Sequence, residues 1–598
     1  MKRTLSLILA IASCLTATAQ TLTVDAEKEL CRIEPLIYGA GAEDVNHEIY
    51  GGLYDQKIFG EGFEEPVPKV VDSRLKISGM WSALGEGVFE HDSIVPFTGK
   101  YSQKISGKAG TGIYNLGLNR WGIAVKKGTQ MKVSVYLKGT AQNVYVSLQS
   151  SDGSKEYART KISGIGNEWK RFDVTLNPKG TDETGRFALS LAEDGTVWVD
   201  QVLLCTDSYP FRADLTEAFR QQHLSFLRYG GCMVNTSEYL TKNMIGSRLE
   251  RQPYYGFWYH QATNGFAIPE FVQFARLIGA EPTFAINIED NPKDVLAMLH
   301  EIEAYNLKYI EIGNEECISA PNRSDYEHYV ERYLILYEAI HRVYPKLQFI
   351  HSAWWRYKEP ELMEYVFRQL DGKCDYWDYH PWTETPQQAK VAEKEMKLMN
   401  KLFHEWNPQT TMRVAILEEN GNTHDMSRAL AHAVMLNAVR RSGGFAAMDS
   451  PANALQPYRQ NDNGWDQGQI FFSPSQVWMQ PPFYAQQMAA TNHQPILVES
   501  LCDTEDLLDY TATRNEAGDM VVLHIVNYDT EAHQLSLEMK NFGKVKDIRS
   551  YTLFGPEKNE NTPIEPTRYS PIPGAVTDGK TLQLKPYSYT VFVITKGK

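Results

Sequence analysis

The sequence predicts an α/β protein built on a (β/α)8 TIM barrel, with an inserted β-sandwich and a second β-sandwich at the C-terminus. Three patterns along the chain predict this arrangement. Between residues 75 and 204, short segments alternate apolar and polar residues, as half-buried strands do. After Pro210, helical stretches alternate with short apolar strands, and strand-like alternation returns from about Pro495. The length of 598 residues suits about three or four domains of ordinary size.

The barrel prediction depends on a count of apolar strands. Eight segments qualify, and eight is the number at which such a barrel closes. They are residues 37–43, 224–229, 282–287, 309–314, 347–353, 375–380, 413–418 and 445–450. A capping box at Ser324-Asp325-Tyr326-Glu327 predicts that Ser324 is the N-cap of the long helix after the fourth strand. The β-rich block follows the first strand, so we expect it as an insertion in the first β-to-α connection.

These patterns divide the chain into five expected parts. They are a signal peptide at 1–19, an N-terminal strand at 20–35 that joins the C-terminal sandwich, the barrel at 36–66 and 207–490, the inserted β-sandwich at 67–206, and the C-terminal β-sandwich at 491–598. Within the insert, Trp169 and Trp198 lie in the alternating pattern and are expected in the core. Trp121 is the better candidate for a surface position.

The first residues have the pattern of a secretory signal. Lys2 and Arg3 precede an apolar run, and Ala17-Thr18-Ala19 supplies a small-x-small cleavage site. This predicts export to the periplasm or the cell exterior. An alternative uses Ile11-Ala12-Ser13-Cys14, which resembles the lipobox of bacterial lipoproteins and would place an acylated Cys14 at the outer surface. No later segment approaches the roughly 18 apolar residues of a membrane span.

Composition excludes several classes of partner. Sixty basic residues against 74 acidic ones give a net charge of -14 with no run of Lys or Arg, so nucleic acid is not expected as a partner. Six cysteines follow the leader without a CxxC pair or a Cys/His cluster, and no phosphate-binding glycine loop is present. We therefore expect no metal and no cofactor. Aromatic residues make up 12% of the chain, and sugar-binding clefts are one common use of such a surplus.

Two glutamates stand where a barrel carries its chemistry, at the C-terminal ends of strands. Glu315 follows the fourth predicted strand and Glu418 ends the seventh. These strands lie across the barrel axis from each other, so both side chains can point into one cleft. Facing carboxylates are what cleavage of a glycosidic bond requires: one donates a proton to the leaving oxygen, and the other stabilises or attacks the anomeric carbon.

The neighbours of this pair leave an alternative open. By strand alternation, Val414, Ile416 and Glu418 share one face and Glu419 lies on the other. Register can slip at a strand end, so Glu419 remains the alternative to Glu418. The charge of Glu419 is also expected to raise the pKa of Glu418 or Glu315.

Beyond this pair, five segments resemble glycoside hydrolase family 51, whose main activity is that of an α-L-arabinofuranosidase. They are YGAGAEDVNHEIYGGL (38–53), LRYGGCMVN (227–235), IEIGNEE (310–316), DYHPW (378–382) and NDNGWDQGQIFF (461–472). Two departures accompany the match. The proline expected before Gly230 is absent, and Glu419 stands where an aromatic residue usually follows the nucleophile.

The resemblance implies a role for each matching side chain. Glu315 would be the acid/base and Glu418 the nucleophile of a retaining double displacement. The substrate-binding residues that it implies are Glu43, Arg228, Asn314, His380 and Trp382, with Trp465 and Gln467 as further candidates. The amide of Asn314 would contact the 2-hydroxyl of the sugar, and Glu43 would hold other hydroxyls. The inserted sandwich resembles carbohydrate-binding modules.

The resemblance also implies a substrate class. The enzyme would release terminal non-reducing α-L-arabinofuranosyl units from arabinose-containing plant polysaccharides or oligosaccharides. Two alternatives remain: a glycosidase of the same fold with another specificity, such as an endoglucanase or xylosidase, and a catalytically silent carbohydrate-binding protein. An oligomer is possible, since relatives often associate.

Overall fold

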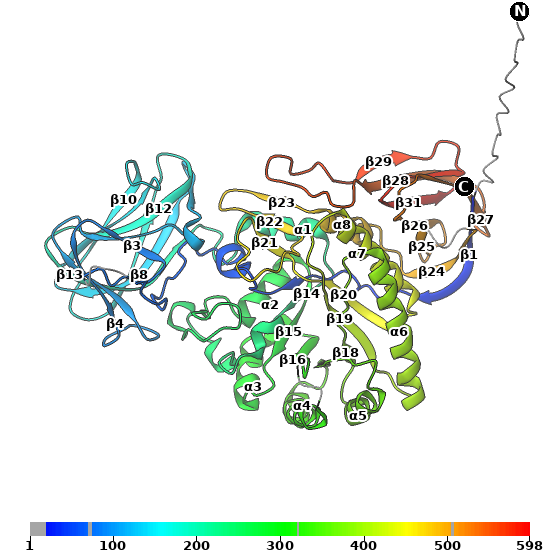
Figure 1. Cartoon of the computed structure of the whole chain (residues 1–598), viewed down its shortest axis with the longest axis horizontal. Coiled ribbons are helices and arrows are strands. Elements are labelled where there is room, and N and C mark those ends of the chain that lie inside the picture. The colour runs from blue at the N-terminus through cyan, green and yellow to red at the C-terminus, as the bar shows by residue number, and fades with distance from the viewer. Residues whose placement is uncertain (1–19, 70–73, 320–321, 504–507, 598) are drawn as a thin grey trace, which may run out of the picture.

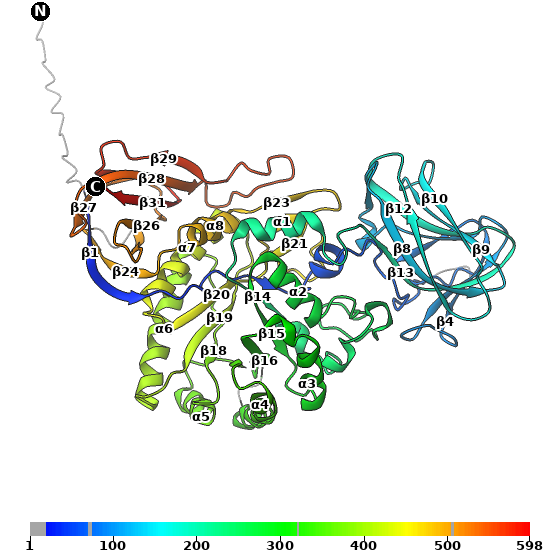
Figure 2. The same cartoon turned by 180° about the vertical axis from the view of Figure 1, so that it is seen from behind.

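The computed structural model describes residues 20–69, 74–319, 322–503 and 508–597. The expected signal peptide and the alternative lipid site at Cys14 lie outside these residues. Figure 1 shows three parts: a barrel in the middle, the inserted strands at one end and the C-terminal strands at the other. The view from behind in Figure 2 shows the same arrangement. The predicted fold class is confirmed, because an eight-stranded parallel sheet is accompanied by two separate groups of strands.

The barrel has one strand for each predicted segment. The strands are β2 (Gly41–Ala42), β14 (Phe226–Tyr229), β15 (Glu281–Ile286), β16 (Tyr309–Glu316), β17 (Gln348–Ala353), β18 (Tyr376–Asp378), β19 (Arg413–Glu419) and β20 (Ala446–Pro451). Each pairs in parallel with the next in chain order. Backbone hydrogen bonds join the two ends of the ring: Gly39 N donates to Asp449 O, and Ala454 N donates to Gly41 O.

Helices surround this ring. They are α1 (Ala213–Gln222), α2 (Ile268–Ile278), α3 (Pro292–Glu301), α4 (Arg323–Val343), α5 (Pro360–Leu370), α6 (Pro386–Trp406), α7 (Met426–Arg441) and α8 (Pro481–Thr491). Five of them carry proline in their first two positions, where its fixed φ suits the first turn. None of the helices in the described ranges is long and apolar enough to cross a membrane.

The start of α4 differs from the prediction. The helix begins at Arg323 with Asn322 as its N-cap, so the capping box expected at Ser324 is wrong and Ser324 lies inside the first turn. Asn322 Nδ2 donates to Asp325 Oδ2 across 3.2 Å. The carboxylate of Asp325 stands near the positive end of the helix dipole, which favours an acidic side chain there.

Side chains from opposite strands fill the inside of the barrel. Tyr309 of β16 and Leu417 of β19 belong to one buried cluster, although their strands are three places apart in the ring. Arg228, Glu311 and Asp378 each lie two residues beyond an apolar member of this cluster, and all three are buried. Because side chains alternate along a strand, these three continue the interior face toward the C-terminal ends. A charged layer therefore lies above an apolar floor.

The inserted strands form two sheets around a core of their own. They are β3 (Trp81–Leu84), β4 (Gly87–Asp92), β5 (Ser102–Gly107), β6 (Gly112–Asn115), β7 (Ile123–Val125), β8 (Met131–Gly139), β9 (Asn143–Gln149), β10 (Glu156–Ser163), β11 (Lys170–Leu176), β12 (Asp182–Leu191) and β13 (Gly195–Cys205). One sheet has the order β11-β8-β13-β5-β4 and the other β10-β9-β12-β6-β3, with β7 on β12. One buried apolar cluster lies between them.

Three tryptophans of the insert, Trp121, Trp169 and Trp198, are only half-buried. Trp198 is half-buried on the outer face of its sheet, since its neighbours Val197 and Val199 point into the core. Trp169 is also half-buried, and Lys138 Nζ lies over both rings. Alternation showed which residues share a face but not which face is inside. Trp121, expected at the surface, is half-buried against the barrel core.

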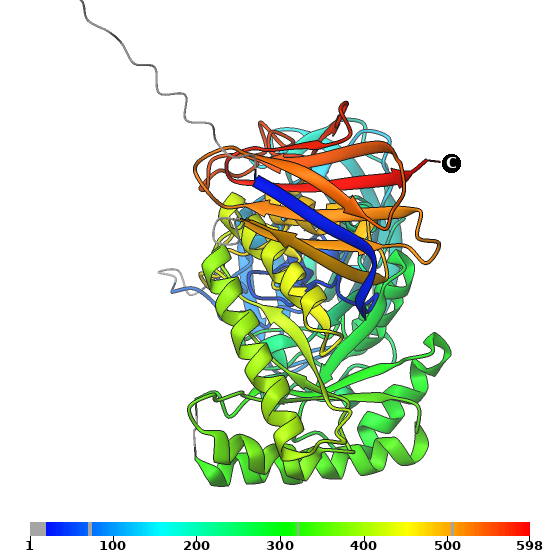
Figure 3. The same cartoon turned by 90° about the vertical axis from the view of Figure 1, so that its right-hand side faces the viewer.

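The C-terminal strands form a nine-stranded sheet of order β29-β28-β31-β26-β25-β24-β1-β27-β30. They are β1 (Gln20–Arg32), β24 (Ile496–Cys502), β25 (Leu508–Arg514), β26 (Met520–Asn527), β27 (His533–Lys540), β28 (Val545–Phe554), β29 (Ile572–Ala575), β30 (Thr581–Leu584) and β31 (Ser588–Lys596). In Figure 3 the N-terminal β1, in blue, lies among the C-terminal strands, where it pairs with β24 and β27. Ile548 of β28 and Leu582 of β30 share one core, so the sheet folds over on itself.

A small sheet lies near the C-terminal ends of the barrel strands. It consists of β21 (Leu455–Pro457), β22 (Ile470–Phe472) and β23 (Val477–Met479). The loop between β21 and β22 contains the NDNG segment that the sequence singled out. The cysteines of the described residues are all free thiols.

Candidate active site

Glu315 lies where β16 leaves regular strand geometry. From Ile312 to Glu316 the strand advances four residues, while its partner β17 advances two, from His351 to Ala353. Glu315 itself has a φ of 47°, in the left-handed region that residues with a Cβ rarely adopt. Bulges of this kind re-aim side chains and occur beside active sites. The strained backbone at Glu315 is therefore what is expected of a functional residue.

Glu418 occupies a second bulge, in β19. This strand advances three residues from Ile416 to Glu419, while β20 advances two, from Asp449 to Pro451. The extra residue changes the alternation of side chains at the strand end. As a result, two consecutive glutamates of β19 reach different surroundings.

The face assignment made from alternation is wrong for this strand. Val414 and Ile416 pack in the large apolar core shared with the helices, whereas Ala415 and Leu417 belong to the cluster inside the barrel. Glu418 follows Leu417 directly, yet its carboxylate also reaches the interior, where it contacts the buried Arg228. The bulge permits this, because regular alternation would have sent Glu418 outward.

The two carboxylates meet at one histidine. His380 Nδ1 lies 3.0 Å from Glu315 Oε1 and 3.6 Å from Glu418 Oε2. One oxygen of each glutamate and this nitrogen all lie within 4.8 Å of one another. On its other side, His380 Nε2 lies 2.6 Å from Asp378 Oδ2. The sequence thus correctly anticipated that strands four, six and seven bring these side chains together.

His380 carries a positive charge in this setting. Burial disfavours the charged imidazole, but the carboxylates of Asp378 and Glu418 outweigh it and raise the pKa of His380 well above its usual value. With acceptors facing both ring nitrogens, both nitrogens can hold a proton. His380 is therefore a fixed cation placed between the two glutamates.

Arg228 supplies a second cation. Its Nη1 donates to Glu418 Oε1 across 2.6 Å, and its Nε and Nη2 donate to the two oxygens of Glu311 at 2.9 and 2.7 Å. Burial would raise the pKa of Glu418, but the charges of His380 and Arg228 hold it below its usual value. The expectation that a neighbouring anion would raise the pKa of Glu418 is therefore wrong.

Glu419 turns away from the cleft into the space beside α7. Its carboxylate accepts hydrogen bonds from Thr383 and Arg428, and it lies 2.6 Å from His432 Nδ1. Burial opposes ionisation, but His432 and Arg428 lower the pKa of Glu419 to about 2. Its carboxylate is paired outside the cleft, so the geometry favours Glu418 over the alternative at Glu419.

Glu43 lies just beyond β2 and is almost fully buried. Its Oε1 accepts a hydrogen bond from Cys232 N at 2.8 Å and another from the indole of Trp258. Burial, together with the charge of Glu418, raises the pKa of Glu43 to about 8. The glycine at 231 is required here, because a Cβ added to Gly231 would lie 1.9 Å from Glu43 Oε2.

Asn314 is fixed by its neighbours. Its Oδ1 accepts from Arg228 Nη2 at 2.7 Å, and its Nδ2 donates to Asn235 Oδ1 at 3.2 Å. Asn235 in turn donates to the backbone oxygen of Asn314 at 2.8 Å. The amide plane is thus locked beside Glu315, with Oδ1 and Nδ2 both engaged. Five of the predicted residues are therefore linked by direct contacts: Arg228 contacts Asn314 and Glu418, and His380 lies beside Glu418 and Glu315.

Trp382 lies at the rim and is 43% exposed. An isolated β-bridge joins its backbone to that of Asn420, and the side-chain Nδ2 of Asn420 donates to Glu418 Oε2 at 3.2 Å. The ring of Trp465 lies 6.1 Å from that of Trp382. Gln467, the other weaker candidate, is buried and accepts a hydrogen bond from Gly421 N, so its amide holds the loop after Glu418.

A cavity of about 170 Å³ opens beside Glu315. Its walls include Trp354 and Tyr357 from the loop after β17, together with Glu395 of α6 and His380. Glu418 is not among its lining residues. The space therefore lies on one side of the pair, next to Glu315.

Within the part of the chain that the structure describes, two groups could each offer three ligands to a metal ion. They are Glu315, His380 and Glu418 in the cleft, and Glu419, His432 and Asp449 behind β19. In the first group, the carboxylates around His380 raise the pKa of its imidazole well above the usual value. In the second group, His432 Nδ1 and Arg428 already satisfy Glu419. Both groups are arranged as ion pairs.

Sequence reasoning missed several contacts of the site. Glu311 and Asp378 are charged residues inside apolar strands, and that pattern was an available signal for interior positions. Asn235 and Trp258 come from irregular segments whose course the sequence does not predict. Trp258 reaches Glu43 from 215 residues away.

Comparison with known proteins gives three family models along the chain. Residues 295–397 match the alpha-L-arabinofuranosidase 1 domain, residues 404–588 match the alpha-L-arabinofuranosidase C-terminal domain, and residues 58–196 match a carbohydrate binding domain. Alpha-L-arabinofuranosidase 1 of Arabidopsis thaliana is 24% identical, covering 97% of this chain and 91% of its own length. Alpha-L-arabinofuranosidase 2 of the same plant is 26% identical, covering 80% and 76%.

Solved structures share the fold. The arabinose-bound α-L-arabinofuranosidase MgGH51 has a TM-score of 0.80 at 20% identity, covering 96% of this chain and all of its own. The arabinose complex of the α-L-arabinofuranosidase from Thermotoga maritima has a TM-score of 0.62 at 16% identity, with the same coverage. A parallel barrel with facing carboxylates at its C-terminal ends, seen beside these matches, defines the class: the chain is a glycoside hydrolase. The two α-L-arabinofuranosidase models that match residues 295–397 and 404–588 support the resemblance to glycoside hydrolase family 51 found in the sequence.

Proposed function

We propose that this enzyme is an exo-acting α-L-arabinofuranosidase that works by double displacement with retention of configuration. The short gap between Glu315 and Glu418 carries the proposal, since one oxygen of each lies within 4.8 Å of the other. Retaining glycosidases hold their carboxyl groups about 5 to 5.5 Å apart, and inverting ones about 6.5 to 9.5 Å. The substrate is supported by the relatives named α-L-arabinofuranosidases that match most of the chain.

In the first step, an oxygen of Glu418 attacks the anomeric carbon as the bond to the leaving oxygen breaks. Glu418 is suited to this role because His380 and Arg228 keep it ionised. Glu315 donates its proton to the departing oxygen, so the leaving group departs as an alcohol. The cavity beside Glu315 gives the leaving group room on the side of the acid.

In the second step, Glu315 acts as the base. It takes a proton from water, the water oxygen attacks the anomeric carbon, and the ester bond to Glu418 breaks. Both glutamates return to their starting forms. Two inversions at one carbon give retention overall.

The remaining residues bind the sugar in this proposal. Asn314 would contact the 2-hydroxyl, where interactions strengthen in the oxocarbenium-like transition state. Glu43, protonated at neutral pH because its pKa is raised to about 8, would hydrogen-bond other hydroxyls. Arg228 and His380 hold Glu418 in position, and Trp382 offers an apolar ring at the rim.

The natural substrates would be arabinose-containing plant polysaccharides or oligosaccharides, cut at terminal non-reducing units. Export to the periplasm or cell exterior is supported by the leader-like first 19 residues. An extracellular exo-α-L-arabinofuranosidase of Streptomyces chartreusis, 27% identical over 44% of this chain, supports the same location. The inserted sandwich, which matches a carbohydrate binding domain, would hold the polymer.

The direct test is hydrolysis of a synthetic aryl α-L-arabinofuranoside by the wild type, Glu315→Ala and Glu418→Ala. We expect Glu315→Ala to lower kcat by about 10² to 10⁴-fold and Glu418→Ala by at least about 10⁴-fold. Added azide should restore turnover of both, giving an α-azide with Glu315→Ala and a β-azide with Glu418→Ala. The exposed Glu327 on α4 provides the control, since Glu327→Ala should keep wild-type rates.

Other outcomes would point elsewhere. Wild-type turnover of an aryl β-glucoside or β-xyloside, but not of the arabinofuranoside, would favour the same-fold glycosidase of other specificity. Binding of glycans without turnover of any of these substrates would favour a silent binding protein. Full activity in either glutamate variant would overturn the assignment of roles.

A further inference from the structure

The inserted sandwich meets the barrel at the loop between β21 and β22. Asn119, from the turn after β6, donates from Nδ2 to Asp462 Oδ2 at 2.6 Å and to Gln460 Oε1 at 3.1 Å. These partners are more than 340 residues away in sequence. A bond from an amide to a carboxylate is stronger than one between neutral groups. The contact therefore ties a turn of the insert to one particular barrel loop.

The backbone of this turn is strained at the contact. Asn119 has a φ of 43° and Arg120 a φ of 63°, two successive residues in the left-handed region. A residue with a Cβ adopts that region at an energetic disadvantage, although asparagine tolerates it better than most. Such strain persists only where the surroundings hold it in place. Here the strained turn directs the side-chain amide of Asn119 toward the barrel loop.

Apolar contacts support the turn on both sides. A Cβ added to Gly51 would lie 2.7 Å from Leu118 Cδ2, so the glycine lets the insert approach the barrel closely. The ring of Trp121 lies 6.0 Å from that of Phe472 in β22. Leu118 and Trp121, which make these contacts, lie on either side of Asn119 in the sequence. The turn is therefore packed against the barrel and not merely hydrogen-bonded to it.

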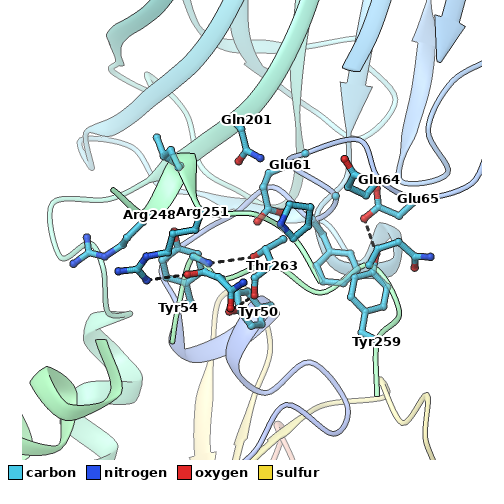
Figure 4. Close-up of a pocket in the computed structure, with 18 residues that line it drawn as sticks. Tyr50, Tyr54, Glu61, Glu64, Glu65, Gln201, Arg248, Arg251, Tyr259 and Thr263 are labelled. Carbon is cyan, nitrogen blue, oxygen red and sulfur yellow. Dashed lines mark hydrogen bonds between the residues drawn. The ribbon is translucent and has the colours of Figure 1, made fainter. Parts of the chain in front are cut away.

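A second contact between the two parts lies nearby, in the pocket of Figure 4. Tyr259 OH donates to Glu65 Oε1 at 2.6 Å, and Glu65 lies in the segment that leads into the insert. The ring of Tyr259 also packs at 5.1 Å from that of His47. His47 Nε2 approaches Asp462 Oδ2 at 3.2 Å. Asp462 is thus held from one side by the insert and from the other by the segment after β2.

The same loop reaches the catalytic cleft. Asn463 N donates to Asn46 Oδ1 at 2.9 Å, and Asn46 Nδ2 donates to the backbone oxygen of Trp465 at 2.7 Å. Asn46 follows the candidate sugar ligand Glu43 by three residues. The ring of Trp465 stands beside the exposed Trp382. The loop therefore joins the insert to two sides of the cleft.

We infer that the inserted sandwich supports the cleft wall, with Asn119 as a positioning residue that holds the β21–β22 loop and fixes Trp465 beside Trp382. This rests on the proposed arabinofuranosidase function. Paired indole rings at the rim suit the apolar face of a sugar ring beyond the cleaved unit. The ligand is thus the second sugar of an arabinose-bearing oligosaccharide. Small aryl glycosides, which lack that sugar, depend less on the loop.

The test uses the full chain with Asn119→Gly, which removes the amide but permits a positive φ. We expect KM for an arabino-oligosaccharide to rise about three- to tenfold, and by more than KM for the aryl arabinofuranoside. We also expect faster amide hydrogen exchange in residues 458–469, which include Asn463 and Asp466. Asn177→Gly, at an exposed asparagine elsewhere in the insert, is the matched control and should change neither.

A swap of partners tests the contact itself. Asn119→Asp places a second carboxylate against Asp462 and should raise KM further. The double variant Asn119→Asp/Asp462→Asn restores a donor and an acceptor, so it should recover both KM and slow exchange. Unchanged exchange in the loop of Asn119→Gly, or no recovery in the double variant, would overturn the inference. A wild type without activity on any arabinofuranoside would instead overturn the proposed function, while the exchange result would still report on the loop.

Discussion

Arg228 donates from Nη1 to the carboxylate of Glu418 across 2.6 Å. The same guanidinium donates to both oxygens of Glu311, and all three side chains are buried. One arginine therefore forms ion pairs with two carboxylates. Burial raises the pKa of the second carboxylate, that of Glu311, to about 7. The ionisation of Glu418 then depends on this arginine and on His380.

Replacing Arg228 with Gln should raise the pKa of Glu418, because one of two nearby cations is removed. Glu418 must be ionised to attack, so the acid limb of the kcat/KM profile should move to higher pH. The loss of activity should therefore be larger at about pH 5 than at about pH 7. Arg228→Lys keeps the charge and should move the limb less. An acid limb at the wild-type pH in Arg228→Gln would contradict this account.

Replacing Asp378 with Asn should lower the pKa of His380. Burial already disfavours the imidazolium, and Asp378 is the foremost of the charges that overcome it. Because its pKa is raised in the folded wild type, His380 keeps its second proton at neutral pH. In the variant it should leave at lower pH, and the pKa of Glu418 should rise in turn. Nitrogen NMR of labelled histidine would follow the change. Identical titration of His380 in both proteins would show that Asp378 does not control it.

His424 gives a prediction about stability. Its Nδ1 lies 2.9 Å from Asp466 of the β21–β22 loop, and its Nε2 is paired with Glu560. Burial opposes the charge, but these carboxylates raise the pKa of His424 to about 9. Because the pKa of His424 is higher in the folded protein, protonation of this histidine stabilises the fold. The contribution is complete below the unfolded pKa of about 6.5 and disappears as the pH rises through about 9.

His424→Gln should therefore destabilise the protein most at about pH 6. The expected loss is about 1 to 2 kcal/mol, reduced from the full shift because both carboxylates are partly exposed. At about pH 9.5 most of the difference between variant and wild type should vanish. Scanning calorimetry at the two pH values measures this. An equal fall in Tm at both would mean that the histidine acts through packing and not through charge.

Much of the fold could be predicted because its signals are local. Each of the eight barrel strands is a short apolar run, and strand ends are where a parallel barrel exposes reactive groups. Glu315 and Glu418 were identifiable on that basis. The start of α4 was placed two residues too late, because a capping box with Ser324 as its N-cap fitted the local sequence, whereas the N-cap is Asn322.

The geometry of the site depends on features without a local signal. The bulges at Glu315 and Glu418 arise from register between neighbouring strands, so alternation assigned the wrong face to Glu418. The charge of Glu419 was expected to disturb the cleft, but His432 and Arg428 from α7 neutralise it. The tie between Asn119 and Asp462 joins parts of the chain 343 residues apart. Such contacts follow from the packing of whole elements.

The stereochemistry of the first product tests the central claim most directly. Proton NMR should follow hydrolysis of an aryl α-L-arabinofuranoside by the wild type during its first minutes, before mutarotation. A double displacement by Glu418 and Glu315 predicts that α-L-arabinofuranose is released first. Initial release of the β anomer would contradict it, because inversion indicates a single displacement by water. That mechanism requires carboxyl groups about 6.5 to 9.5 Å apart.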